Sequence, residues 1–274
     1  MNNDDAQRLI QRLLSDAKAF NQKTQKVSTP AELSNVFDFQ PNPSARSTQD
    51  LQVFIDNYLK FASPTQSKVF MNQLWSKVEP ASLVGEVLSA VTNTSMYTYE
   101  VAPVATMLEQ SLIRHLTSLI WTSPGDGVMT SGGTASNLQG LMVARNERIA
   151  GAKSSGLFSM GERAFVLASR EAHYSIKRAC NLLGLGHESF IEVETDKQGI
   201  MTAQAVEDAL LAVSAKNGRV LAVVATAGTT VKGVFDDLKG IGELCQKNEI
   251  WFHVDGAYGA SVLLSPSHKS LMEG

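Results

Sequence analysis

Residues 220–230 read VLAVVATAGTT, an apolar run that ends in small residues. The run shows no alternation with polar residues, which is typical of a β-strand buried on both faces of a parallel sheet. The residues that follow, Thr226 to Thr230, are small or carry hydroxyl groups and predict a turn at the strand's carboxyl end. Ligands of open α/β sheets bind at that end of the strands, so the stretch also indicates where to look for a site.

Strand-like and helix-like segments alternate on both sides of this run. The strand-like segments are DGVMTSGG (126–133), RAFVLAS (163–169), SFIEVETD (189–196) and IWFHVDGAYG (250–259), and the helix-like segments are 134–152, 173–185, 202–218 and 236–249. This order predicts an α/β fold, with a mainly parallel sheet and helices on both of its faces.

The first part of the chain has a different texture. Residues 4–20 and 47–63 carry apolar residues at helical spacing, with Ser47 or Thr48 as a cap for the second segment, and no strand-like run occurs there. Prolines and polar residues in 27–33 and 37–47 predict connectors. We therefore expect a helical N-terminal segment over 1–80 and an α/β large domain over 81–274.

Composition and charge narrow the class of protein. The chain has 274 residues, 43% of them apolar, and a formal net charge of −3, which does not favour a nucleic acid or an anionic membrane as partner. Its two cysteines, Cys180 and Cys245, lack the spacing of a metal site and predict a reduced, cytoplasmic setting. We expect neither a signal peptide nor a membrane span.

The first strand end reads TSGGTASNLQG, residues 130–140. Gly132 and Gly133 predict a tight turn, and the small and hydroxyl-bearing residues after them open a helix, where free backbone N–H groups suit a phosphate. The segment is neither a Walker loop nor a dinucleotide-binding fingerprint. A plain strand–turn–helix with a Ser/Thr cap explains it equally well when it is taken alone.

Three other strand ends carry an imidazole, a hydroxyl and a carboxylate. His173 follows a strand, where a capping role is the ordinary reading, and Thr226 lies in a Gly-containing turn. Asp255 ends an apolar strand, and a buried carboxylate needs either an Arg or helix N-terminus, or a protonated heterocyclic nitrogen. One edge of the sheet would thus carry a phosphate cradle, an imidazole, small residues and a buried acid. Together these groups point to pyridoxal phosphate.

The quoted segments resemble a known family. NTSMYTYEVAPV (93–104), SGGTASN (131–137), AHYSIKRA (172–179), VATAGTTVKGVFDDL (224–238) and IWFHVDGAYGASVLLS (250–265) are similar to the group II pyridoxal-phosphate-dependent amino acid decarboxylases of fold type I, in the glutamate and cysteine sulfinate decarboxylase branch. The resemblance implies a homodimeric enzyme with a fold type I large domain. It would convert glutamate, aspartate or cysteine sulfinate into the amine and CO2.

The resemblance also implies roles for single residues. The residues expected to bind the cofactor are Ala135 and Ser136 at the phosphate, His173 and Ala257 on the two faces of the ring, Thr226 beside the ring, and Asp255 at the ring nitrogen. His173 and Asp255 are the expected catalytic residues. The residues expected near the substrate are Gln73, Ser95 and Tyr97, and the Ser-x-Tyr version looks closer to the cysteine sulfinate decarboxylases. Segments 93–104 and 172–179 argue against an aminotransferase or a cysteine desulfurase.

The chain departs from the family pattern near its end. Family members carry the Schiff-base lysine in a His-Lys pair beyond the strand-end Asp. His268 and Lys269 form such a pair, but LLSPSHKSLMEG (263–274) is similar to a different family segment, so Lys269 is not expected to be that lysine. The small C-terminal domain and the substrate-binding arginine are also expected to be absent. An inactive fragment that binds cofactor weakly or dimerises is therefore the alternative expectation.

Overall fold

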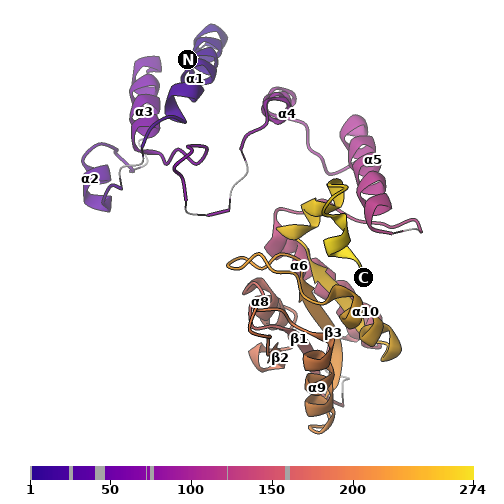
Figure 1. Ribbon diagram of the computed structural model, residues 1–274. Coiled ribbons are helices and arrows are strands. Elements are labelled where there is room, and N and C mark those ends of the chain that lie inside the picture. The colour runs from indigo at the N-terminus through magenta and orange to yellow at the C-terminus, as the bar shows by residue number, and fades with distance from the viewer. Residues whose placement is uncertain are drawn as a thin grey trace. The chain divides into compact units, whose positions relative to one another are not determined.

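The computed structural model describes residues 2–24, 27–40, 47–71, 73–74, 77–121, 123–157 and 161–274. The chain folds into two compact units, Met1–Ser95 and Met96–Gly274. Figure 1 labels most of their helices and strands.

The first unit is helical. Its helices are α1 (Asn3–Phe20), α2 (Pro30–Ser34), α3 (Thr48–Phe61) and α4 (Pro80–Thr92). Ser47, one of the two caps expected from the sequence, caps α3 and forms a reciprocal box with Asp50. The connector predicted over 27–33 is wrong in part, because Thr29 and Glu32 form a second capping box that starts α2 at a proline. Arg12 of α1 is bonded to Asp56 of α3, which joins the two longer helices.

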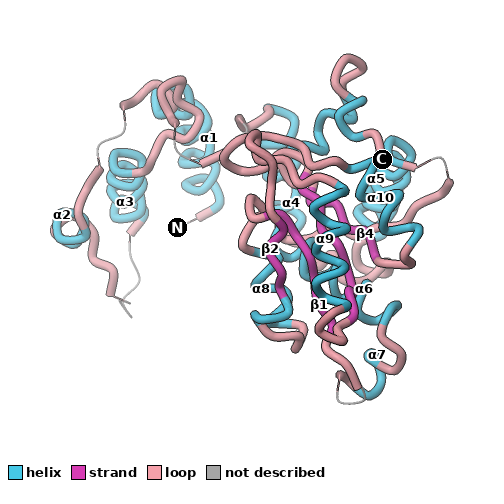
Figure 2. The backbone as a smooth tube through the Cα atoms, turned by 60° about the horizontal axis from the view of Figure 1, so that its bottom comes forward, coloured by secondary structure: helices cyan, strands magenta, loops and turns pink. Residues whose placement is uncertain are grey.

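The second unit contains the sheet. Its elements are α5 (Pro103–Ile120), α6 (Gly133–Arg148), α7 (Ala152–Ser155), β1 (Ala164–Ser169), α8 (Ser175–Leu182), η1 (His187–Ser189), β2 (Phe190–Val193), α9 (Ala203–Ser214), β3 (Arg219–Thr226), α10 (Leu238–Lys247), β4 (Trp251–Asp255), η2 (Gly259–Leu264) and η3 (Lys269–Met272). The four strands are parallel and lie in the order β2-β1-β3-β4 (Figure 2). The α/β fold class with a parallel sheet is confirmed.

Helices cover both faces of the sheet, and each face has its own core. On one face α6 and α8 pack on the strands around Leu141, Ile176 and Val224. On the other face α9 and α10 pack around Val206 and Ile241. Residues 221–225 of β3 are at most 1% exposed, because both faces are covered, and this is why the strand shows no polar alternation.

The strand expected over 126–133 is wrong. Residues 123–130 form no strand, and α6 begins at Gly133. The backbone N–H of Met129 donates to the Glu109 carboxylate of α5 at 3.1 Å instead of to a neighbouring strand. Gly125 and Gly127 also disfavour an extended ladder.

Two further expectations concern the cysteines and membranes. Cys180 and Cys245 are free and buried, and burial raises the pKa of each thiol to about 12. Among the helices within the described ranges, none has the length and apolar character that a membrane crossing requires.

Candidate functional site

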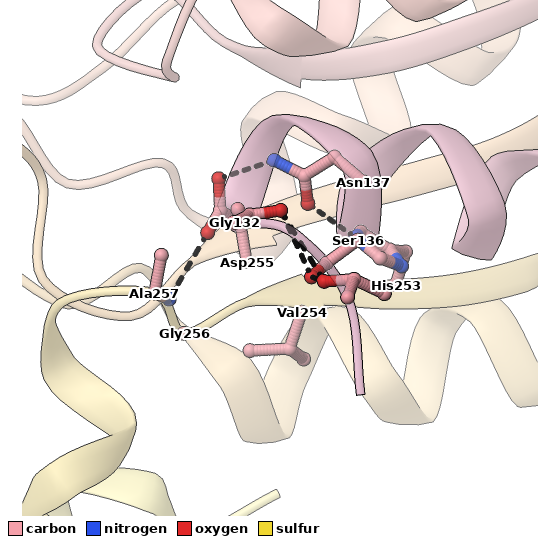
Figure 3. Close-up of a pocket in the computed structure, with 10 residues that line it drawn as sticks. Gly132, Ser136, Asn137, His253, Val254, Asp255, Gly256 and Ala257 are labelled. Carbon is pink, nitrogen blue, oxygen red and sulfur yellow. Dashed lines mark hydrogen bonds between the residues drawn. The ribbon is translucent and has the colours of Figure 1, made fainter. Parts of the chain in front are cut away.

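A cavity of about 310 Å³ lies at the carboxyl edge of the sheet, between the start of α6 and the end of β4. The residues that line it are Thr130, Gly132, Gly133, Ser136, Asn137, His253, Val254, Asp255, Gly256 and Ala257 (Figure 3). The sheet order places β1, β3 and β4 next to one another, so the turns after these strands meet at one rim.

Asp255 is the acidic group of this cavity. It is the last residue of β4 and only 8% of its surface is exposed. Its Oδ2 accepts a hydrogen bond from Asn137 Nδ2 at 2.9 Å, and its Oδ1 accepts one from the Ala257 backbone N–H at 3.1 Å. Both donors are neutral, and none of the described residues that line the cavity is a lysine or an arginine. The carboxylate therefore lies buried without a cationic partner in the described part of the chain.

Asn137, which lines the cavity, is hydrogen-bonded to three side chains. Besides Asp255, its Nδ2 donates to Ser175 Oγ at 3.0 Å. Its Oδ1 lies 2.9 Å from His253 Nε2 (Figure 3). His253 and Asp255 are two residues apart on β4, so their side chains point to the same face of the sheet, the face that α6 covers. Burial lowers the pKa of His253, against the opposing effect of the Asp255 charge, and this favours the neutral imidazole.

The start of α6 forms the other wall. Its N-cap is Gly132, with φ of 126°, a conformation that favours glycine, and it supplies no side-chain acceptor to the helix. The first N–H groups of a helix lack intrahelical acceptors, so they are available to an anion. Ser136 Oγ lies 2.6 Å from Thr130 Oγ1, which places two hydroxyl groups beside these amides.

His173 and Thr226 lie next to the cavity but outside the set of residues that line it. His173 Nδ1 is 2.8 Å from Ser175 Oγ, and through Ser175 it is connected to Asn137. Thr226 ends β3 and pairs in register with Asp255. Its Oγ1 is buried and makes no hydrogen bond within the described residues, so it has capacity to bind a ligand atom.

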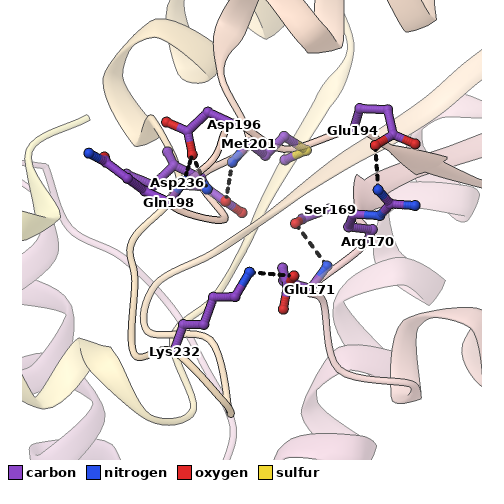
Figure 4. A network of polar contacts seen from close by, with 10 residues as sticks. Ser169, Arg170, Glu171, Glu194, Asp196, Gln198, Met201, Lys232 and Asp236 are labelled. Carbon is purple, nitrogen blue, oxygen red and sulfur yellow. Dashed lines mark hydrogen bonds and ion pairs between the residues drawn. The ribbon is translucent and has the colours of Figure 1, made fainter.

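The loop after β3 is fixed by acidic residues (Figure 4). Asp236 is 4% exposed, and its two oxygens accept from the Thr226 and Met201 backbone N–H groups at 2.7 and 2.8 Å. Burial raises the pKa of Asp236 to about 6, although both hydrogen bonds act in the opposite direction. Lys232 of the same loop pairs with Glu171 at 2.8 Å, which ties the β3 loop to the β1 loop that carries His173.

The structure brings together some of the predicted site residues and not others. Ser136, Asp255 and Ala257 share the cavity, and Ala135 lies beside them in the first turn of α6. Gln73 and Ser95 belong to the first unit, and the Tyr97 side chain is 92% exposed, so the predicted roles of these three residues stay predictions.

Sequence reasoning missed Asn137, Ser175 and His253 as members of the site. One signal could have identified His253, because strand alternation places it on the same face as Asp255. Lys269 is exposed in η3 and does not line the cavity.

The residues present fit the predicted cofactor. A buried carboxylate with only neutral donors suits a protonated ring nitrogen, and an uncapped helix start beside two hydroxyl groups suits a phosphate. The buried, unsatisfied Thr226 Oγ1 adds a hydrogen-bonding group at the same rim. Asp255, Ser136 and the first amides of α6 are therefore the groups that would hold pyridoxal phosphate.

Comparison with known proteins agrees with the assignment of this site to pyridoxal phosphate. The chain is 34% identical over 266 residues to human cysteine sulfinic acid decarboxylase, covering 97% of this chain and 54% of that protein. It is also 34% identical over 265 residues to the glutamate decarboxylase of Drosophila melanogaster, covering 96% of this chain and 52% of that protein. The chain thus spans about half the length of these curated relatives.

A solved structure and a family model extend the comparison. The crystal structure of mouse CSAD superposes with a TM-score of 0.94 at 33% identity, over 99% of this chain and 57% of that one. Residues 30–274 match the model of the pyridoxal-dependent decarboxylase conserved domain, and pyridoxal phosphate as the expected cofactor is thereby confirmed. The chain belongs to the pyridoxal-dependent decarboxylase family.

Proposed function

We propose that this chain forms the cofactor-binding part of a decarboxylase that removes the α-carboxyl group of a small acidic L-amino acid. The observation that carries the proposal is the buried Asp255 carboxylate, which faces a cavity together with the uncapped start of α6. The names of two relatives, a cysteine sulfinic acid decarboxylase and a glutamate decarboxylase, support cysteine sulfinate or glutamate as the substrate. The name of a third, an acidic amino acid decarboxylase, keeps aspartate within the proposed substrate class.

Each residue of the site has a distinct task in this proposal. Asp255 keeps a proton on the ring nitrogen, because a buried anion stabilises the adjacent cation. Ser136 and the first amides of α6 hold the phosphate, while His173 and Ala257 confine the ring between them. Bound pyridoxal phosphate supplies an electron sink for the pair released when the bond to the carboxyl carbon breaks, and CO2 leaves.

We further propose that this chain by itself holds the cofactor without a covalent link. The residues that line the cavity, within the described ranges, include no lysine, and Lys269 is exposed in η3. A covalent lysine link normally adds to cofactor retention and catalysis. Binding by the 274-residue chain is therefore expected to be reversible, with little or no turnover.

The test combines binding and turnover. The purified chain is titrated with pyridoxal 5'-phosphate, reduced with borohydride and mapped by mass spectrometry, and CO2 release is measured with each of the three acids and with an aromatic amino acid. We expect saturable binding without a modified Lys269, equal binding by K269R, and CO2 only from acidic substrates in a longer protein that contains this chain. Absence of saturable binding, or preference of that longer protein for the aromatic substrate, would contradict the proposal.

We also propose that the protein associates as a homodimer. Apolar side chains on α5 are exposed, among them Val104 at 71%, Leu108 at 58% and Leu112 at 51%, and exposed apolar helix faces mark association surfaces. Light scattering coupled to size exclusion is expected to give twice the 29.6 kDa mass of the chain. L108E, which puts a charge on this face, is expected to give the mass of one chain. A wild-type mass near that of one chain would contradict the proposal.

A further inference from the structure

A chain of hydrogen bonds runs from His253 and Asn137, which line the cavity, through Ser175 to His173. The distances are 2.9 Å from His253 Nε2 to Asn137 Oδ1, 3.0 Å from Asn137 Nδ2 to Ser175 Oγ, and 2.8 Å from Ser175 Oγ to His173 Nδ1. A branch from Asn137 Nδ2 reaches Asp255 Oδ2 at 2.9 Å. The chain of bonds therefore connects the buried acid to the imidazole that is proposed to confine the cofactor ring.

The direction of the donors is fixed from the Asp255 end. A carboxylate accepts hydrogen bonds, so the atom of Asn137 beside Asp255 must be the donor Nδ2. A flipped amide would bring two acceptor oxygens together at this distance. Oδ1 consequently faces His253, and His253 must carry its proton on Nε2 to donate to it.

The direction is fixed independently from the His173 end. The backbone N–H of Ser175 donates to His173 Nδ1 at 3.3 Å, so this nitrogen is an acceptor and its ring carries the proton on Nε2. The Ser175 hydroxyl must then donate to His173 Nδ1 as well, and its oxygen accepts from Asn137 Nδ2. Both ends require the same orientation of the Asn137 amide.

Packing holds the central groups in place. Asn137 is 4% exposed and Ser175 is 1% exposed, so water does not compete for their bonds. The ring of His253 lies against Gly140 of α6, where an added Cβ would come within 2.6 Å of His253 Cε1. Any residue other than glycine at position 140 would therefore require the His253 ring to move.

We propose that Asn137 is a positioning residue that orients the Asp255 carboxylate and, by donating to Ser175 Oγ, directs the Ser175 hydroxyl proton toward His173 Nδ1, which favours the His173 tautomer protonated on Nε2. One amide thus sets both the group at the ring nitrogen and the proton position of the imidazole beside the ring. The consequence for cofactor binding rests on the proposed function, whereas the proton positions do not depend on it.

The proton positions are measured directly in the full chain. Two-bond ¹H–¹⁵N spectra of the chain labelled in its five histidines distinguish protonated Nδ1 from protonated Nε2, and single His→Gln variants assign the signals. We expect the Nε2-protonated pattern for both His173 and His253. A protonated Nδ1 on either ring in the neutral form would overturn the proposal.

Two variants separate positioning from simple packing. S175A removes the hydroxyl at 2.8 Å from His173 Nδ1 and keeps the weaker backbone N–H donor at 3.3 Å, so it is expected to raise the fraction of His173 protonated on Nδ1. It leaves the bond between Asn137 and Asp255 in place, so His253 is expected to be unchanged. N137L keeps the size of the side chain but neither donates nor accepts, so it is expected to alter the signals of both rings. Unchanged signals in both variants would overturn the proposal even if either variant is less stable.

Cofactor binding provides the second readout. N137L is expected to weaken binding of pyridoxal 5'-phosphate about tenfold, because the Asp255 carboxylate loses one of its two donors. Q139L is the matched control, since Gln139 is an exposed amide two residues along the same helix, and it should bind as wild type does. If wild type fails to bind the cofactor, the proposed function fails, but the proton positions still test the role of Asn137. Equal affinity of wild type and N137L would overturn the orienting role toward Asp255.

Discussion

Alanine in place of Asp255 is expected to weaken the binding of pyridoxal 5'-phosphate about 100-fold, or about 3 kcal/mol. The carboxylate is 8% exposed, so water cannot replace it as the partner of a protonated ring nitrogen. The variant also leaves Asn137 Nδ2 and the Ala257 N–H without their shared acceptor. The change in cofactor absorbance during a titration of the purified chain measures the dissociation constant.

Two further variants make this result interpretable. D255N keeps the size of the side chain and removes the charge, so it is expected to lose a similar amount of affinity. D208N removes a charge from the exposed face of α9 and is expected to bind the cofactor as wild type does. A D255N dissociation constant within about threefold of the wild-type value would contradict the charge pairing proposed for Asp255.

Replacement of Asp236 is expected to change both stability and its pH dependence. D236A removes the acceptor of two buried backbone N–H groups, at Thr226 and Met201, and is expected to lower the free energy of unfolding by about 2–4 kcal/mol. One of these bonds holds Thr226, the last residue of β3, next to the cavity. Urea unfolding followed by circular dichroism measures the difference.

The pH dependence follows from the raised pKa of Asp236. Its folded pKa of about 6 lies above the ordinary value of 3.8, so protonated Asp236 contributes stability that is fully present below pH 3.8. That contribution, up to about 3 kcal/mol, is lost as the pH rises through 6. The side chain of D236N stays neutral at every pH. The free energy of unfolding of D236N is therefore expected to lie furthest below that of wild type near pH 4, and the difference is expected to shrink by pH 7.5.

D237N is the matched control for this series. Asp237 caps α10 by accepting from the Gly240 N–H at 3.0 Å, and asparagine caps helices about as well. Its free energy of unfolding is expected to differ from wild type by about 0.5 kcal/mol or less at every pH. A constant gap between D236N and wild type from pH 4 to 8 would show that burial does not raise the Asp236 pKa.

The sequence pattern predicted most of the strands and the fold class because burial and secondary structure leave their signal in neighbouring residues. A continuous apolar run such as 220–226 indicates a strand buried on two sides, and the alternation of strands with helices indicates a parallel sheet. The segment 126–133 has only Val128 and Met129 as apolar residues, and the backbone N–H of Met129 donates to Glu109 of α5 rather than to a strand. Strand assignment failed there because pairing depends on what lies beside a segment.

The site divides in the same way. The sequence by itself determined the α/β class, the turns at the strand ends, and the candidates Ser136, His173 and Asp255, since residue type and position along a strand are local properties. Only the tertiary structure joined Asp255 to Asn137, 118 residues earlier, and Asn137 to Ser175, 38 residues later. Hydrogen-bond partners so distant in sequence are brought together by the packing of α6 and α8 on one face of the sheet, and no local pattern contains that packing.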